Sequence, residues 1–203
     1  MRSSRLEAFS DGVLAIIITI MVLELHTPAT ATLLGRDGLL HTTGLSLLTY
    51  LLSFIYVGIY WSNHHHLFQV VPHVDGTVLW ANLHLLFWLS LYPFTTAWMD
   101  EQRLARTPTM VYGVNLAGAA FAYWVLVTVI RRLPTSGHFD EVFGADWKGR
   151  LSIVFYAIGI GLCFVRPWLG VLPYIAVALM WLIPDRRVER WLQERDKMPR
   201  PGA

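Results

Sequence analysis

Six apolar blocks, separated by short segments that carry most of the charged residues, dominate this sequence. A helix that crosses a lipid bilayer needs about 20 mostly apolar residues, and backbone polar groups at that depth are satisfied only within helices or closed barrels. The sequence therefore predicts an all-α membrane protein with six transmembrane helices in a single domain. The predicted spans are residues 9–25, 45–61, 78–98, 110–130, 151–165 and 169–183.

The last two blocks are the shortest, and only the pair Arg166-Pro167 and its neighbours separate them. They are long enough for two short spans, and a shallow hairpin that enters and leaves the membrane on one side is the alternative. No Gly/Ser linker or low-complexity tract divides the chain. We therefore expect one domain, whichever form the last two blocks take.

Composition supports a membrane protein. Charged residues make up 15% of the chain, against about 25% in an ordinary soluble domain, so too few polar side chains exist to coat a globule of this size. This excludes a disordered chain and a nucleic-acid-binding domain. The single cysteine, Cys163, excludes an intramolecular disulfide. The lipid bilayer is the first expected partner.

Basic residues predict the orientation, because Lys and Arg in short loops resist translocation. Placing the N-terminus in the cytoplasm puts 12 of the 16 Lys and Arg residues inside and leaves Arg36, Arg103, Arg106 and Arg166 outside. Six spans then place both termini in the cytoplasm, in a multi-pass protein of the cell membrane. Residues 184–203 form a basic cytoplasmic tail, either as an amphipathic helix on the inner leaflet or as a solvated end.

The first block resembles a signal peptide in two respects. Basic residues precede it, and Ala29-Thr30-Ala31 imitates a small-residue cleavage site. Acidic residues within and beside the apolar run, Glu7, Asp11 and Glu24, are poor signal-peptide features. We expect the block to remain in the protein as its first helix.

Ser10 and Asp11 stand at the start of this first block. An acid at membrane depth is unfavourable unless it is paired or hydrated, so the pair predicts a polar network. The alternative is that one of them caps the helix N-terminus, where the positive end of the helix dipole also favours acidic residues. A polar network and a helix cap are both compatible with the sequence.

Beyond Asp11 the block is aliphatic. At about 100° per residue, Ile16, Ile20 and Leu23 share one narrow face, with Thr19 near its edge, while Ser10 and Asp11 point away. Periodicity alone is typical of an ordinary packing face. A face turned to a central axis would instead form rings of branched side chains.

Two motifs resemble the transmembrane protein 175 family of potassium channels. The first is Arg5-x-x-x-Phe9-Ser10-Asp11 followed by an aliphatic helix, and the second is the end of the second span, with Trp61, His64 and Phe68. Asp75 and Asn82-Leu83 follow at similar spacing. The chain is identified as a bacterial member of this family on these residues.

The resemblance implies a homotetramer of six-helix subunits whose first helices line the pore, in a fold unrelated to the usual tetrameric potassium channels. It also implies an aliphatic constriction that begins five residues after the Asp of the first motif. In this sequence the pore residues are then Ile16, Thr19, Ile20 and Leu23. No Thr-Val-Gly-Tyr-Gly filter occurs in the chain.

Polar residues at the ends of the first two spans meet at the cytoplasmic face. We expect them to form a network that holds the first helix in position, with a pH response through His64 as one possibility. Snorkelling of Arg5 and hydration of His64 are the alternative. The expected members are Arg5, Phe9, Ser10, Asp11, Trp61 and His64.

The run His64-His65-His66 suggests a metal site, but three consecutive helical residues point about 100° apart and cannot all bind one ion. We therefore expect no metal and no cofactor. The absence of HExxH, GxSxG and P-loop motifs argues against an enzyme. Glu24 either concentrates cations at the outer mouth or simply ends the span.

Together these features predict a cation channel that passes potassium, with weak selectivity over sodium, through a hydrophobic constriction that acts as filter or gate. Monovalent cations, above all potassium, are its expected permeating ions. The alternative function is a proton channel or a proton-coupled secondary transporter that uses Asp11 and His64.

Overall fold

A computed structural model describes residues 2–25, 44–69, 71–133 and 147–182. These residues form helices and no named strand, which confirms the all-helical prediction for the described part of the chain. The predicted basic tail and the small-residue sequence at 29–31 lie outside the described residues. The helices are α1 (Ser3–Leu23), α3 (Gly44–Gln69), α4 (Gly76–Ser90), α5 (Tyr92–Glu101), α6 (Arg106–Arg131), α8 (Trp147–Leu162) and α9 (Pro167–Leu182).

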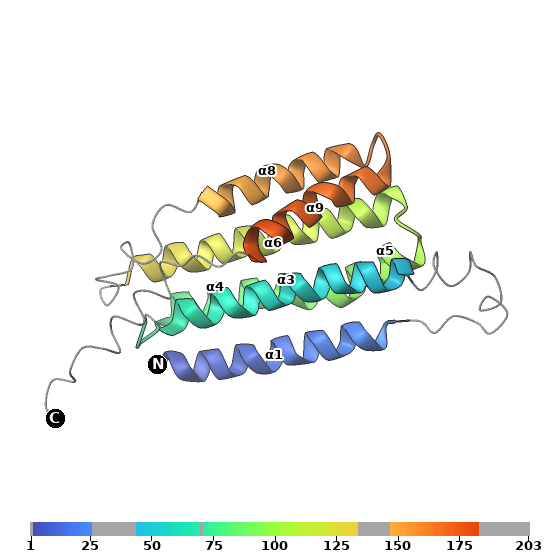
Figure 1. Cartoon of the computed structure of the whole chain (residues 1–203). Coiled ribbons are helices and arrows are strands. Elements are labelled where there is room, and N and C mark those ends of the chain that lie inside the picture. Colours follow the sequence, from blue (N-terminus) through green and yellow to red (C-terminus); the bar gives the residue numbers. More distant parts are fainter. Residues whose placement is uncertain (1, 26–43, 70, 134–146, 183–203) are drawn as a thin grey trace, which may run out of the picture.

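The helices run side by side in an up-and-down bundle (Figure 1). α1 lies at one edge and packs mainly against α3, α4 and α5, while α8 and α9 lie toward the opposite edge against α6. The first turns of α1, α4 and α8 and the last turns of α3, α6 and α9 share one end of the bundle. We call this the N-terminal end and the other the far end.

Helix length and composition agree with the predicted spans in part. α1, α3 and α6 are long and apolar enough to cross a bilayer. α8 and α9 have 16 residues each, which extend about 24 Å at 1.5 Å per residue, less than the roughly 30 Å of a hydrocarbon core. A full crossing by these two helices remains a prediction.

The third predicted block, residues 78–98, is two helices rather than one. α4 ends at Ser90 and α5 begins at Tyr92, with Leu91 serving as a cap to both. Pro93 lies at the start of α5 and explains the break, because proline lacks an N–H donor and its ring crowds the carbonyl four residues earlier.

Glycines allow α8 and α9 to approach closely. A Cβ added at Gly159 would lie 2.8 Å from the carbonyl oxygen of Gly170, and one added at Gly170 would lie 2.7 Å from the carbonyl oxygen of Gly159. Only two glycines fit at that separation. The close contact places the ring of Tyr174 against Gly159 and Gly113, in the core of the bundle.

Hydroxyl groups join α3, α5 and α6 within the core. The Ser53 hydroxyl lies 2.7 Å from that of Thr96 and 2.9 Å from that of Tyr112. Asn115 donates through Nδ2 to the Thr95 hydroxyl at 3.2 Å. Buried polar groups need such partners, so this cluster fixes how the three helices meet.

Candidate functional site

The outward face of α1 is aliphatic and uncovered. Ile16 is 59% exposed and Leu23 is 80% exposed, and Ile20 and Thr19 are exposed with them. The opposite face of the same helix is in the core, where Leu14, Ile17 and Met21 are buried. The four predicted pore residues therefore lie together on the uncovered side of α1, which is the edge helix in Figure 1.

Small residues accompany this stripe. Ala8, Gly12 and Ala15 are exposed, and a Cβ added at Gly12 would meet nothing within 4 Å. In membranes, small residues on a helix face let another helix approach closely. The free side of α1 thus combines branched side chains with positions suited to a neighbouring helix.

Helix capping does not explain Ser10 and Asp11, so that alternative is wrong. α1 begins at Ser3, and the residue before it, Arg2, makes no side-chain cap. Ser10 and Asp11 are therefore in the interior of the helix, in its second and third turns, beyond the four N–H groups that a cap could satisfy.

Ser10, Asn82 and His64 form a buried chain of hydrogen bonds at the N-terminal end of the bundle. His64 donates through Nε2 to the Asn82 Oδ1 at 2.8 Å, and Asn82 donates through Nδ2 to the Ser10 hydroxyl at 3.0 Å. Ser10 then donates to the Leu6 carbonyl at 2.9 Å. The chain joins α3, α4 and α1.

Asp11 belongs to a separate contact. Trp61 donates through its indole N–H to Asp11 Oδ1 at 3.1 Å, at the exposed surface between α1 and α3. The structure thus brings Ser10 together with His64, and Asp11 together with Trp61, in two contacts rather than one network. The roles of these residues remain predictions.

Arg5 and Phe9 join neither contact. Both are exposed, and the Arg5 guanidinium has no hydrogen bond or ion pair among the described residues. The geometry of the helix gives the reason, since at 100° per residue Arg5 and Phe9 lie within about 20° of Ile16 around the axis. Their placement in the network is corrected: they extend the free stripe of α1 toward the N-terminal end.

Sequence reasoning missed two members of this region. Asn82 was noted only for its spacing, yet its amide is the middle of the buried chain. A lone amide inside an apolar block was the available signal, because a polar group at membrane depth needs a partner. The second omission is the contact of Glu7 Oε1 with His65 Nδ1 at 2.6 Å. The two residues are 58 positions apart in the chain, so no motif spacing could predict their contact.

The histidine run does not form a metal site in the described residues. His64 faces the core and is buried, while His65 faces Glu7 on α1. No group of three or more His, Cys, Asp or Glu side chains able to hold a metal ion occurs among the residues that the structure places.

Glu24 follows the last turn of α1 at the far end. There it lines an open groove of about 490 Å³ together with Glu101, Ser90 and the start of α5. Both carboxylates are exposed. The groove adjoins Ile20 and so places negative charge beside the far-end part of the free stripe.

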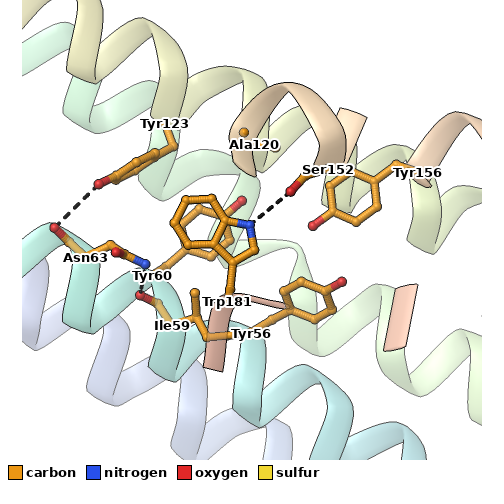
Figure 2. Close-up of a pocket in the computed structure, with 10 residues that line it drawn as sticks. Tyr56, Ile59, Tyr60, Asn63, Ala120, Tyr123, Ser152, Tyr156 and Trp181 are labelled. Carbon is orange, nitrogen blue, oxygen red and sulfur yellow. Dashed lines mark hydrogen bonds between the residues drawn. The ribbon is translucent and has the colours of Figure 1, made fainter. Parts of the chain in front are cut away.

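A small cavity lies between α3, α6, α8 and α9, away from α1. Figure 2 shows Tyr56, Tyr60 and Trp181 around it, with the Trp181 indole N–H donating to the Ser152 hydroxyl at 2.9 Å. Its volume of about 30 Å³ has room for roughly two water molecules. Ligand pockets usually occupy about 300–1,000 Å³, so this cavity offers no room for an organic substrate.

Comparison with known proteins agrees with this geometry. A family model described as endosomal/lysosomal potassium channel TMEM175 matches residues 5–93. A protein of Chryseobacterium sp. (strain P1-3) named a potassium channel is 49% identical over 195 residues, which are 96% of this chain and 100% of that protein. An endosomal/lysosomal proton channel TMEM175 of Danio rerio is 33% identical over 119 residues, covering 56% of this chain and 21% of that protein.

A solved structure is similar along nearly the whole chain. The crystal structure of a lysosomal potassium-selective channel TMEM175 homolog from Chamaesiphon minutus has a TM-score of 0.74 and 30% sequence identity, and covers 89% of this chain and 96% of that one. The residues that the family model matches, 5–93, include the free stripe of α1 and both polar contacts. With a full-length relative at 49% identity and a shared fold, the chain belongs to the TMEM175 family of channels.

Proposed function

We propose that this protein is a homotetrameric cation channel that passes potassium, with weak selectivity over sodium, through a pore lined by α1. One observation carries the proposal: Ile16, Thr19, Ile20 and Leu23 lie together on the uncovered face of the edge helix, while the opposite face is buried. Its relatives' names, potassium channel and potassium-selective channel, supply the ion.

The pore chemistry follows from those side chains. A ring of isoleucines offers a cation no ligand, so an ion must pass a narrow, partly dewetted neck and shed part of its hydration. Potassium holds its water less tightly than sodium, and the neck favours it modestly on that account. Small changes in the diameter of the neck would open or close it.

Thr19 adds the one hydroxyl on the stripe between Ile16 and Leu23. Its Oγ1 donates to the Ile16 carbonyl at 2.8 Å, and its lone pairs remain available to a passing ion. We propose that it contributes a polar layer immediately beyond the Ile16 ring. At the outer end, the carboxylate of Glu24 would raise the local concentration of cations.

Six spans, with α4 and α5 crossing together and both termini in the cytoplasm, complete the proposed architecture. The excess of basic residues at the N-terminal end of the bundle supports this orientation. In a bacterial cell the protein would then lie in the cell membrane. No enzymatic step is part of the proposal.

The proton-coupled carrier gains little support from the geometry. Asp11 and His64 were its proposed relay, yet each bonds a different partner, Trp61 and Asn82 respectively. His64 Nδ1 is buried without a hydrogen-bond partner among the described residues, so a proton added there would have no acceptor. A channel that also passes protons would have the same pore, so only a measurement of the conducted ions distinguishes it from a potassium channel.

Ion flux in liposomes tests the proposal. Purified protein would be reconstituted, and gradients of potassium, sodium and protons imposed in turn. We expect passive flux that follows each electrochemical gradient and is larger for potassium than for sodium. Flux of one ion that drives another uphill would establish a carrier, and flux of protons alone would establish a proton channel.

A further inference from the structure

Two side-chain pairs join the N-terminal half of α1 to the C-terminal part of α3 on their shared surface. Asp11 meets Trp61, and one turn earlier Glu7 meets His65, whose Nδ1 lies 2.6 Å from Glu7 Oε1. The rings of Trp61 and His65 stack, with centroids 6.1 Å apart and planes 16° apart. The two acids are four residues apart on α1 and their partners four apart on α3, so each pair supports the other.

The hydrogen bonds of His65 define its protonation in this arrangement. Gln69 donates through Nε2 to the His65 Nε2 at 2.7 Å, so His65 Nδ1 carries the proton that is donated to Glu7. A second proton, at Nε2, would convert the contact with Glu7 into an ion pair. The Gln69 side chain would then turn its amide to present the carbonyl oxygen, which accepts from the imidazolium.

The position of Glu7 on α1 allows this contact to shift the helix relative to the proposed pore. Glu7 and Ile16 are nine residues apart, which at 100° per residue places them on opposite sides of the helix. A force that draws Glu7 toward α3 therefore draws α1 away from the side to which Ile16 points.

Few other charges face His65. Glu7 is its partner from α1, Asp11 holds its stacking neighbour Trp61, and on α3 itself the rings of His64 and His66 flank it. α9 contains no charged residue or histidine, and His84 is the one such residue in α4. The acids of α5, Asp100 and Glu101, lie at the far end. α6 also contacts α3; it contains no acid or histidine and carries Arg106 at the far end and Arg131 in its last turn. Glu7 is thus the acidic group that responds directly to the charge of His65.

We propose that Glu7 and His65 form a pH-sensitive clamp that positions the N-terminal half of α1 and thereby sets the width of the pore. The effect on flux rests on the proposed function, because it requires α1 to line the pore. Histidine changes its charge between about pH 5 and 8. On acidification the clamp gains an ion pair and holds α1 toward α3, and the neck widens; at alkaline pH the hold weakens and the neck narrows.

Potassium flux through the natural chain and four variants in liposomes tests the clamp. For the natural chain we expect flux to rise roughly twofold to fivefold from pH 8 to pH 6, the size that coupling through a partly exposed ion pair allows. His65→Gln keeps a donor to Glu7 but cannot titrate, and Glu7→Gln removes the negative partner, so both should lose the pH response. The exchanged pair, Glu7→His with His65→Glu, should restore it.

His66→Gln is the matched control, because it removes a neighbouring histidine from the same helix turn and leaves the Glu7 contact in place. It should keep the pH response of the natural chain. A response that survives in His65→Gln and Glu7→Gln, or one that is lost in His66→Gln, overturns the proposal.

A second measurement is independent of ion flux. The ¹⁵N spectrum of the histidine side chains in lipid-reconstituted protein reports which ring nitrogen carries a proton, and the His65→Gln variant identifies the signals of His65. We expect the doubly protonated form of His65 to increase on acidification, and Glu7→Gln to reduce that form. If His65 does not respond to Glu7→Gln, the clamp is wrong; if it responds while no variant conducts ions, the proposed channel function is wrong and the clamp remains.

Discussion

Asn82 on α4 donates through its amide to the hydroxyl of Ser10 on α1 at 3.0 Å, although the two residues are 72 positions apart in the chain. Both side chains are buried, and the same amide accepts from His64 on α3. One side chain thus holds three helices in a fixed relation. Because Ser10 points into the helix bundle, this contact also fixes which face of α1 is left free.

Replacing Asn82 by Leu should destabilise the protein, because it removes the amide and leaves a branched apolar side chain in its place. The change leaves the His64 Nε2 donor buried without an acceptor, at a cost of about 1–3 kcal/mol. We expect the Tm of the detergent-solubilised protein to fall by roughly 3–10 °C. Asn63→Leu is the matched control, since among the residues that the structure describes the Asn63 amide bonds only the Ile59 carbonyl of its own helix. Equal losses in the two variants would contradict this role for Asn82.

The close contact of α8 and α9 should tolerate no added methyl group. In Gly159→Ala the new Cβ would meet the backbone carbonyl of Gly170 and the ring of Tyr174, and overpacking of this kind costs about 1–3 kcal/mol. Gly161→Ala, two residues away, meets nothing within 4 Å and gains up to about 1 kcal/mol of helix propensity. In thermal unfolding experiments, the Tm should fall for Gly159→Ala and not for Gly161→Ala. A rise in the Tm of both variants would show that α8 and α9 separate easily.

Thr19→Val should weaken selectivity without closing the pore. The substitution keeps the shape of the side chain and removes the one hydroxyl beside the Ile16 ring. We expect the potassium-to-sodium permeability ratio to fall roughly twofold, because a hydroxyl layer offers a partly dehydrated ion an oxygen ligand. Thr128→Val on α6 loses the same type of hydroxyl-to-backbone bond, there to the Trp124 carbonyl at 2.8 Å, and should leave the ratio unchanged. A ratio unaffected by Thr19→Val would remove Thr19 from the selective layer.

The sequence predicted the fold well because apolar blocks report membrane helices directly. Each predicted block corresponds to helix in the structure, but the bounds differ: α3 continues eight residues beyond Trp61 to Gln69, through the histidine run. Histidines lower the apolar character of that segment without stopping a helix. The break at Leu91 was missed because Pro93 is compatible both with a bend and with a new helix start.

The site was predicted less completely, for a geometric reason. Helical periodicity places Ile16, Ile20 and Leu23 on one face, and the structure agrees that this face is free. Periodicity does not show which helices pack against one another. The partners of Ser10, Asp11 and Glu7 therefore could not be derived from spacing within α1. Arg5 was assigned to the network by its charge, although its angle around the helix placed it beside Ile16.

The relative permeability of sodium and potassium in Ile16→Asn tests the central claim most directly, with Ile158→Asn as its control. Ile158 is also an exposed isoleucine, on α8 at the opposite edge of the bundle. If α1 lines the pore, the Ile16 variant should wet and widen the neck, raising conductance and sodium permeability, while the Ile158 variant conducts as the natural chain does. An unchanged ratio and conductance in Ile16→Asn, or the same change in both variants, would contradict a pore lined by α1.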